Sequence, residues 1–228
     1  MVNQDSQNNK ELMEQKEHVL RIAMHEFIHH GIKQVKMDDV AKMLGMSKRT
    51  LYEIFQDKED LLLEGVKSYK QYCREQQELD LQRSQNILEL LLRSFSRKME
   101  EFRHTNFRFY QDIYRYPKVL QYLIHCSEEE NKDFREQMER GVKEGLFRSD
   151  INYDIFILLL SEQFRVLFER DGWDRFSPMD MFRSILFVSL RGILTHQGLL
   201  LFEQFVDEDF IIRDTHFFEE TERVINNR

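Results

Sequence analysis

The sequence is poor in the residues that interrupt regular structure. Among 228 residues there are two prolines and eight glycines, while apolar residues make up 41%. Because proline and glycine most often break helices, long helices around a hydrophobic core are the natural expectation. The chain is also longer than one small domain needs, so we expect a small module followed by a larger body.

Cysteine and long apolar segments are equally scarce. Cys73 and Cys126 belong to no CxxC pair and no Cys/His cluster with zinc-ligand spacing, so we expect reduced thiols and no metal or other cofactor. The runs IFILLL and ILFV are far shorter than the roughly 20 residues of a membrane-spanning helix. The opening residues lack the basic and apolar regions of a secretory signal, so we expect a cytoplasmic protein with no membrane partner.

Patterns typical of catalytic sites are also missing. The sequence has no glycine-rich phosphate loop, HExxH, GxSxG or paired-carboxylate pattern in a suitable context, so we expect no enzymatic activity. His25 and His29 have the spacing of a helical metal-ligand pair, but without a third ligand at helical spacing solvated histidines are the better interpretation. The net charge of −8 argues against a chain that coats nucleic acid, so any DNA contact must be local.

The sequence does contain a series of short amphipathic segments between residues 17 and 60. Apolar residues at helical spacing predict a first helix over 17–31 that ends at Gly31, and a second over 37–44. Gly45 can take the positive φ that ends a helix, and Ser47 can cap a third helix. Asp57 is a candidate N-cap for a fourth, linking helix. The pattern predicts a helix, a tight turn and a second helix.

The third helix, KRTLYEIF, is predicted to be two-sided. Leu51 and Phe55 point inward, whereas Lys48 and Arg49 begin a polar, basic outer face. From Lys33 to residue 50 five cations face two aspartates, so the local charge is 5 − 2 = +3 in an acidic chain. Taken alone, these cations are better explained as ordinary surface residues in contact with solvent.

These segments resemble the DNA-binding domain of the TetR family of bacterial regulators over roughly residues 17–65. The matching positions, in register without a gap, are Phe27, Gly31, Val40-Ala41, Gly45-Met46-Ser47, Thr50-Leu51-Tyr52, Phe55, Lys58 and Leu61. Two departures from the family pattern, Lys36 for Thr or Ser and Arg49 for Gly, each add a cation near the expected DNA surface.

The resemblance implies that the third helix enters the major groove, with base contacts from its first turn and phosphate contacts around it. It also implies phosphate contacts for the tyrosine hydroxyl of TLY and for the lysine that follows the phenylalanine. The DNA-binding candidates are therefore Lys36, Met37, Ser47, Lys48, Arg49, Thr50, Tyr52 and Lys58.

The rest of the chain is predicted to be helical, and aromatic residues concentrate before Pro117. In the resembled family a short helix at this place lines an effector cavity, which implies a small-molecule effector of unknown identity. Core packing is the alternative role for any single candidate. The ligand-binding candidates are Phe95, Met99, Phe102, Phe107, Tyr110, Tyr114 and Gln163.

Two later helices are apolar around more than one face, which predicts burial on two sides. The first follows a possible cap at Asp150, and the second begins at Ser177-Pro178. A four-helix seam between two subunits is one interpretation, and the centre of a monomeric core is the other. The dimer-interface candidates are Ile155, Leu159, Phe182, Ile185, Leu186, Ser189 and Ile193.

We therefore expect an all-α protein in which an N-terminal three-helix helix-turn-helix domain is joined by a linking helix to a larger helical ligand-binding and dimerisation domain. The expected parts are a polar, disordered arm over 1–16, the DNA-binding domain over 17–60 and the effector-binding and dimerisation domain over 61–228. The preferred function is a ligand-responsive repressor that binds a palindromic double-stranded DNA operator as a homodimer. The alternative is a helical interaction or small-molecule-sequestering protein with a vestigial DNA contact.

Overall fold

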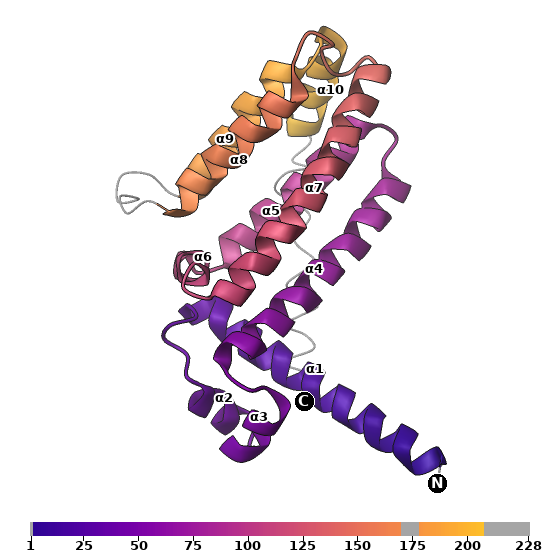
Figure 1. Ribbon diagram of the computed structural model, residues 1–228. Helices are drawn as coiled ribbons and strands as arrows, with labels where there is room; N and C mark the ends of the chain where they lie inside the picture. The colour runs from indigo at the N-terminus through magenta and orange to yellow at the C-terminus, as the bar shows by residue number, and fades with distance from the viewer. Residues whose placement is uncertain (1, 170–177, 208–228) are drawn as a thin grey trace. The chain divides into compact units, whose positions relative to one another are not determined.

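The computed structural model describes residues 2–169 and 178–207, and these residues are almost entirely helical (Figure 1). The predicted all-α class is confirmed, since the described residues hold no β-strand beyond one isolated bridge between Phe147 and Leu194. No helix in these ranges is both long and apolar enough to cross a membrane. The helices are α1 (Val2–His30), α2 (Met37–Met43), α3 (Lys48–Ile54), α4 (Lys58–Arg83), α5 (Ile87–His104), α6 (Phe107–Ile113), α7 (Pro117–Lys143), α8 (Tyr153–Glu169), α9 (Pro178–Ile193) and α10 (His196–Asp207).

The chain forms two compact units. Unit 1 consists of residues 1–75 and 104–127, and unit 2 consists of residues 76–103 and 128–228. Unit 1 therefore contains α6 and the start of α7 in addition to the expected helix-turn-helix, whereas we expected the division of the chain near residue 60. The long helices α4 and α7 each belong partly to both units.

The core of unit 1 gathers apolar residues from α1, α2, α3, α4, α6 and α7. Phe27 of α1 is 1% exposed, and Leu51 and Phe55 are at most 1% exposed, as the two-sided pattern of the third helix predicts. In Figure 1, α2 and α3 lie side by side next to the second half of α1. Burial of these side chains, each worth about 1.5–3 kcal/mol, holds the short helices in place, because seven residues are too few for an independent helix.

The predicted start and stop signals of unit 1 are confirmed. Gly31 and Gly45 have φ of 83° and 63°, the left-handed conformation in which glycine is the least strained residue. The Ser47 hydroxyl accepts the Thr50 N–H at 3.1 Å, and the Asp57 carboxylate accepts the Asp60 N–H at 2.7 Å. These caps set the direction in which α3 and α4 leave their turns.

Helix α1 is longer than expected. It begins at Val2, so residues 2–16, for which we expected a disordered arm, are helical and continue into the first predicted helix. Among the residues of α1 whose side chains the structure describes, Val19 is the first that is buried, and Leu12 and Met13 are more than half exposed. Lys16, near the middle of the helix, donates to the Glu64 carboxylate on α4 at 2.9 Å.

Helix α6 closes the end of α1 with hydrogen bonds across about 80 residues of sequence. The Asn106 backbone N–H donates to the Ile28 carbonyl at 2.8 Å, and its side-chain amide donates to the His29 carbonyl at 3.0 Å. The buried Asp112 carboxylate accepts the Lys33 N–H at 2.7 Å. Backbone carbonyl and N–H groups at the end of α1 and just after it, which have no partner within the helix, thus form hydrogen bonds with residues that are distant in sequence.

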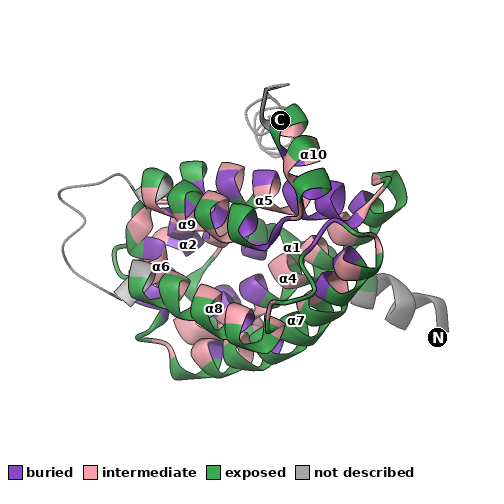
Figure 2. Cartoon of the chain, turned by 90° about the horizontal axis from the view of Figure 1, so that it is seen from above, coloured by how far each residue is buried: buried purple, intermediate pink, exposed green. Residues whose placement is uncertain are grey.

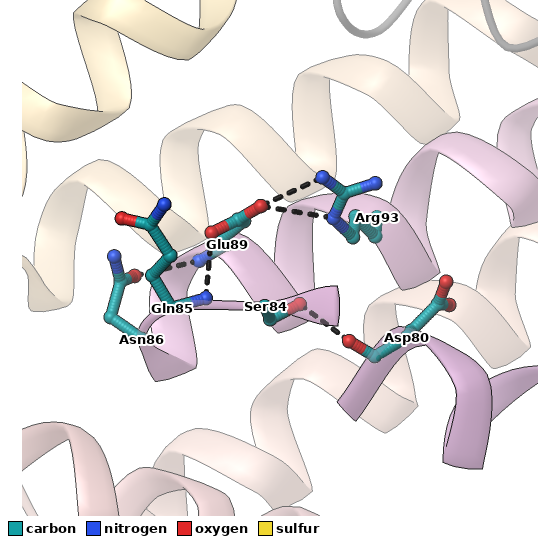
Figure 3. A network of polar contacts seen from close by, with 6 residues as sticks. All are labelled: Asp80, Ser84, Gln85, Asn86, Glu89 and Arg93. Atoms are coloured by element: carbon teal, nitrogen blue, oxygen red, sulfur yellow. Dashed lines mark hydrogen bonds and ion pairs between the residues drawn. The ribbon is translucent and has the colours of Figure 1, made fainter. Parts of the chain in front are cut away.

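Unit 2 is built on the apolar face of α5, with Phe147 and Phe202 among its fully buried side chains. A polar network holds the start of α5 (Figure 3). The Asn86 amide oxygen accepts the Glu89 N–H at 2.9 Å, the Glu89 carboxylate accepts the Gln85 N–H at 2.8 Å, and Arg93 donates to Glu89 at 2.7 Å. Because Glu89 is buried, the hydrogen bonds that its carboxylate accepts from Gln85 and Arg93 compensate its loss of water.

Helices α8 and α9 differ in detail from the prediction. The cap of α8 is Asn152, whose side-chain oxygen accepts the backbone N–H groups of residues 154 and 155 at 3.1 and 3.2 Å. Asp150, the expected cap, instead pairs with Arg148 at 2.7 Å. Helix α9 begins at Pro178, and its expected cap Ser177 lies outside the described residues, as does the tail beyond Asp207.

Candidate nucleic-acid interface

The outer face of α3 carries two well-exposed cations of the helix-turn-helix. The side chain of Arg49 is 89% exposed and that of Lys48 is 60% exposed, while Leu51 on the opposite face is fully buried. The helix is held by the Ser47 cap at one end and by packing of Phe55 at the other. A rigid helix with a basic face of this kind is suited to the major groove of DNA.

Both of these cations are paired with carboxylates on the same surface. Lys48 donates to Asp38 of α2, and the Nε of Arg49 donates to Glu53 one turn further along α3 at 2.9 Å. All four side chains are at least 41% exposed, so each pair is worth at most about 1 kcal/mol and can be exchanged for a DNA contact.

Three further candidates lie on the same outer surface. Tyr52 is 47% exposed, Lys36 is exposed at the start of α2, and Thr50 is partly exposed. The Thr50 hydroxyl lies 2.8 Å from that of Ser47, so Ser47 serves mainly as the cap of α3. These residues surround the basic face, as phosphate contacts around a groove-bound helix must.

Met37 and Lys58 are placed differently from the other DNA-binding candidates. Met37 is 7% exposed and packs in the core of unit 1, so its side chain is not part of the outer surface. The Lys58 ammonium donates to the Ile32 carbonyl and lies 5.6 Å from the ring centroid of Phe27. Burial lowers the pKa of Lys58, and the nearby Asp112 carboxylate opposes part of that shift. Its contacts are thus intramolecular in this conformation.

The ligand-binding candidates are divided between the two units. Phe95, Met99 and Phe102 belong to unit 2, where Phe102 stacks on Phe182 with ring centroids 5.4 Å apart. Phe164 extends this aromatic cluster, since its ring centroid lies 5.1 Å from that of Phe182.

The other ligand-binding candidates lie in two places. Phe107, Tyr110 and Tyr114 belong to unit 1, and Tyr114 is 40% exposed. Gln163 is exposed and lines a groove of about 410 Å³ between α8 and α9. The role of these residues in binding a ligand stays a prediction.

The dimer-interface candidates separate into exposed and buried residues. Ile155 and Leu159 are 54% and 56% exposed, and Ile185 and Ser189 are partly exposed. Phe182, Leu186 and Ile193 are at most 5% exposed and pack within their own chain, which corrects their expected place at a surface. The physical reason is that α9 uses one apolar face against its own unit and leaves the other outward.

An apolar stripe on α8 and α9 is larger than we expected. Within residues 153–166 of α8, Ile157 alone is buried, and Figure 2 shows α8 largely in the colours of exposed and intermediate residues. Leu158 and Val166 are 59% and 42% exposed, and Val188 on α9 is 74% exposed. Contiguous exposed apolar surface of this kind is characteristic of protein–protein interfaces.

Sequence reasoning missed several residues of the site and its supports. Asp38 and Glu53 were visible as acids, and the i, i+4 spacing of Arg49 and Glu53 was a usable signal for their pairing. No local pattern indicated that Asn106 and Asp112 hold the end of α1. Such contacts join residues nearly 80 positions apart, and a single sequence does not reveal them.

The groups of side chains that could hold a metal ion are a second kind of candidate site. Among the described residues no group of three or more histidine, cysteine or acidic side chains is placed to hold a metal ion. His25 and His29, the pair considered for metal binding, have ring centroids 4.3 Å apart, and His25 lies 3.2 Å from the Glu26 carboxylate. The exposed face of α3 therefore remains the best-defined candidate site.

Residues 19–64 match the model of a protein family described as bacterial regulatory proteins, tetR family. The matched segment begins in α1, contains α2 and α3, and ends in the first turns of α4. It contains every one of the proposed DNA-binding residues.

Two similar proteins match the chain over more than its N-terminal segment. The HTH-type transcriptional repressor KstR2 of Mycolicibacterium smegmatis is 28% identical over 147 residues, which cover 61% of this chain and 71% of that protein. The ketosteroid transcriptional regulator KstR2 of Mycobacterium tuberculosis has a similar structure, with a TM-score of 0.55 and 20% identity over 80% of this chain and 96% of that one.

A transcriptional regulator of Saccharomonospora viridis, solved in complex with choline, has a TM-score of 0.67 and 20% identity over 81% of this chain and 100% of its own. At these identities the structural likeness establishes the fold alone.

Proposed function

We propose that this chain is a DNA-binding transcription regulator of the TetR type, a repressor that binds a palindromic operator as a homodimer and responds to a small-molecule effector. The observation that carries this proposal is the exposed, cationic α3 on a helix-turn-helix whose core and caps are complete. The similarity to the repressor KstR2 of Mycolicibacterium smegmatis favours repression over activation.

The apolar stripe of α8 and α9 supports the homodimer. Ile155, Leu158 and Leu159 occur at i, i+3 and i+4 and form one outward face of α8, and Val188 borders the same groove as Ile155 and Leu159. A second copy of the chain would cover this stripe by a two-fold axis, since an isologous interface uses the same patch on both subunits. Two recognition helices related by that axis require two half-sites of inverted sequence.

Two observations support an effector. The aromatic cluster of Phe102, Phe164 and Phe182 packs inside unit 2 and supplies the kind of apolar, flat-sided surroundings that would suit a flat or apolar molecule. In unit 1, α6 is hydrogen-bonded to the end of α1, so a displacement of α6 would act directly on the helix-turn-helix. The proteins of similar structure include a ketosteroid regulator and a regulator solved with choline.

The proposal is tested by DNA binding at one fixed, near-physiological salt concentration. Purified protein is titrated with duplex DNA from upstream of its own gene and with a scrambled duplex of the same composition. The wild type is compared with a Lys48→Ala/Arg49→Ala double variant. A matched control is Lys98→Ala/Arg103→Ala, which also removes one lysine and one arginine; these cations of α5 are 48% and 45% exposed and are each paired with a carboxylate.

We expect the wild type and the control to prefer the upstream duplex by at least about a thousandfold, the lower end of specific recognition, and the α3 double variant to lose that preference. Equal, weak binding of both duplexes by all three proteins would instead favour the interaction or sequestering role. Loss of preference in the control as well would show that net charge, and not the α3 surface, determines the binding.

A further inference from the structure

Arg49 and Glu53 form a side-chain pair on the face of α3 that is proposed to enter the groove. They lie one turn apart, and their side chains are 89% and 61% exposed. A carboxylate at this place is unexpected, because an unpaired negative charge next to DNA is repelled by the phosphates. Its presence on the recognition surface therefore calls for a role that offsets the repulsion.

The atoms that form the pair suggest this role. The contact runs from the Nε of Arg49 to the Glu53 carboxylate at 2.9 Å. A guanidinium has five N–H donors in a fixed, planar fork, so a bond at Nε leaves the four donors on the two terminal nitrogens available. Those terminal donors match the O6 and N7 acceptors of guanine, the commonest base contact of arginine in the major groove.

We propose that Glu53 is a positioning residue that holds the Arg49 guanidinium in the plane of a base edge, and that the pair specifies one guanine in each operator half-site. This inference rests on the proposed function. It assigns a positioning role in base recognition to Glu53, which the sequence pattern did not single out, and it gives a defined partner to an arginine that stands where the resembled family often has glycine.

Pre-orientation is the physical reason for the effect. A free arginine side chain has many rotamers, and holding it in one of them loses conformational entropy. Glu53 makes part of that loss occur before DNA is bound, and it makes the orientation that fits guanine the favoured one. A well-formed bidentate arginine–guanine contact gives roughly 5- to 150-fold discrimination against the other bases.

The chain offers a closely matched control for charge. Asp38 on α2 also holds a cation of the same surface, Lys48, but it has no contact with Arg49. Asp38→Asn and Glu53→Gln each remove one negative charge from the surface, and Glu53→Ala also removes the acceptor oxygen. Alanine is the best helix former, so α3 should stay folded in this variant, which circular dichroism will verify.

The experiment selects bound duplexes from a random DNA pool with the full-length wild type and with four variants, Arg49→Ala, Glu53→Ala, Glu53→Gln and Asp38→Asn. Dissociation constants are then measured for the selected duplex and for its three single-base replacements at each guanine. We expect Arg49→Ala to lose the preference for one guanine per half-site. Glu53→Ala should reduce that same preference at least about fivefold. Glu53→Gln should have a smaller effect, and Asp38→Asn should retain the guanine.

Three results would overturn the inference while leaving the proposed function intact. In the first, no guanine depends on Arg49. In the second, the Arg49-dependent guanine is kept in Glu53→Ala. In the third, Asp38→Asn loses the same guanine, which would indicate a general effect of charge. A wild type that selects no common sequence would refute the sequence-specific operator binding of the proposed function, and the inference with it.

Discussion

Replacing Asp112 by alanine should loosen the connection between α6 and the end of α1. The Asp112 carboxylate is buried and accepts the Lys33 N–H at 2.7 Å, which makes this a charge-assisted hydrogen bond. Loss of a hydrogen bond to a charged group costs about 1.5–3 kcal/mol. The ion pair with Arg115 at 3.8 Å adds little, because the arginine side chain is 65% exposed.

We expect Asp112→Ala to lower the free energy of unfolding of the unit by this amount. For a chain of 150–250 residues each 1 kcal/mol corresponds to about 2–4 °C, so the Tm should fall by about 3–12 °C. The pKa of Lys58 should fall further below its ordinary value, because the Asp112 charge partly offsets the effect of burial on that ammonium.

The assay combines thermal unfolding followed by circular dichroism with amide hydrogen exchange. The Lys33 N–H should exchange faster in Asp112→Ala, while Asp112→Asn, which keeps an acceptor oxygen, should lose less than half as much stability. Arg115→Ala should cost less than about 1 kcal/mol. An unchanged Tm together with unchanged protection of the Lys33 amide would refute the assignment of this contact as a tertiary anchor.

Three further predictions concern the surface, the charge and the packing of the chain. Leu159→Glu should convert the proposed dimer to a single chain of 27.9 kDa in light scattering, because each lost leucine contact is worth about 1.5–3 kcal/mol and occurs twice by symmetry. The control is Leu200→Glu, at a similarly exposed leucine of α10, which should leave the dimer intact. Hydrogen bonds from Lys67 and a second lysine lower the pKa of Glu64 below 4.5, so its stabilising contribution is present above that pH and is lost as the pH falls through the folded pKa. Glu64→Gln should therefore have a lower urea midpoint than wild type at neutral pH, and the two midpoints should converge as the pH falls below the folded pKa of Glu64. Gly141→Ala would place a Cβ 2.0 Å from a buried phenyl ring of unit 2, and chemical unfolding should show a loss of at least about 1–3 kcal/mol; an unchanged midpoint would indicate that the ring can move aside.

Local physics explains why the helix-turn-helix was predictable. The turn at Gly45, the cap at Ser47 and the buried pair Leu51 and Phe55 are separated by a few residues, so spacing alone encodes their roles. The same holds for the outward direction of Arg49, since one face of a short helix is occupied by the core. The expected functions of these residues in binding DNA remain predictions.

Long-range contacts explain where the sequence was insufficient. Lys58 has the spacing of a phosphate contact, yet its ammonium donates to the Ile32 carbonyl in the folded chain. The apolar residues of α9 are alike in the sequence, but Phe182 is buried within its own unit while Val188 is 74% exposed. Which of two apolar faces is covered depends on the helices that pack against it, and those helices come from distant parts of the chain.

The sequence by itself determined the helical class, the order of the helices, the tight turn before α3 and the cationic outer face of that helix. Each follows from interactions within a few residues: periodicity, capping and backbone conformation. Tertiary structure alone decided that Asn106 and Asp112 hold the end of α1 and that α8 leaves an apolar stripe outward. These features depend on which distant surfaces meet, and that is set by the free energy of packing the whole unit, which no local pattern contains.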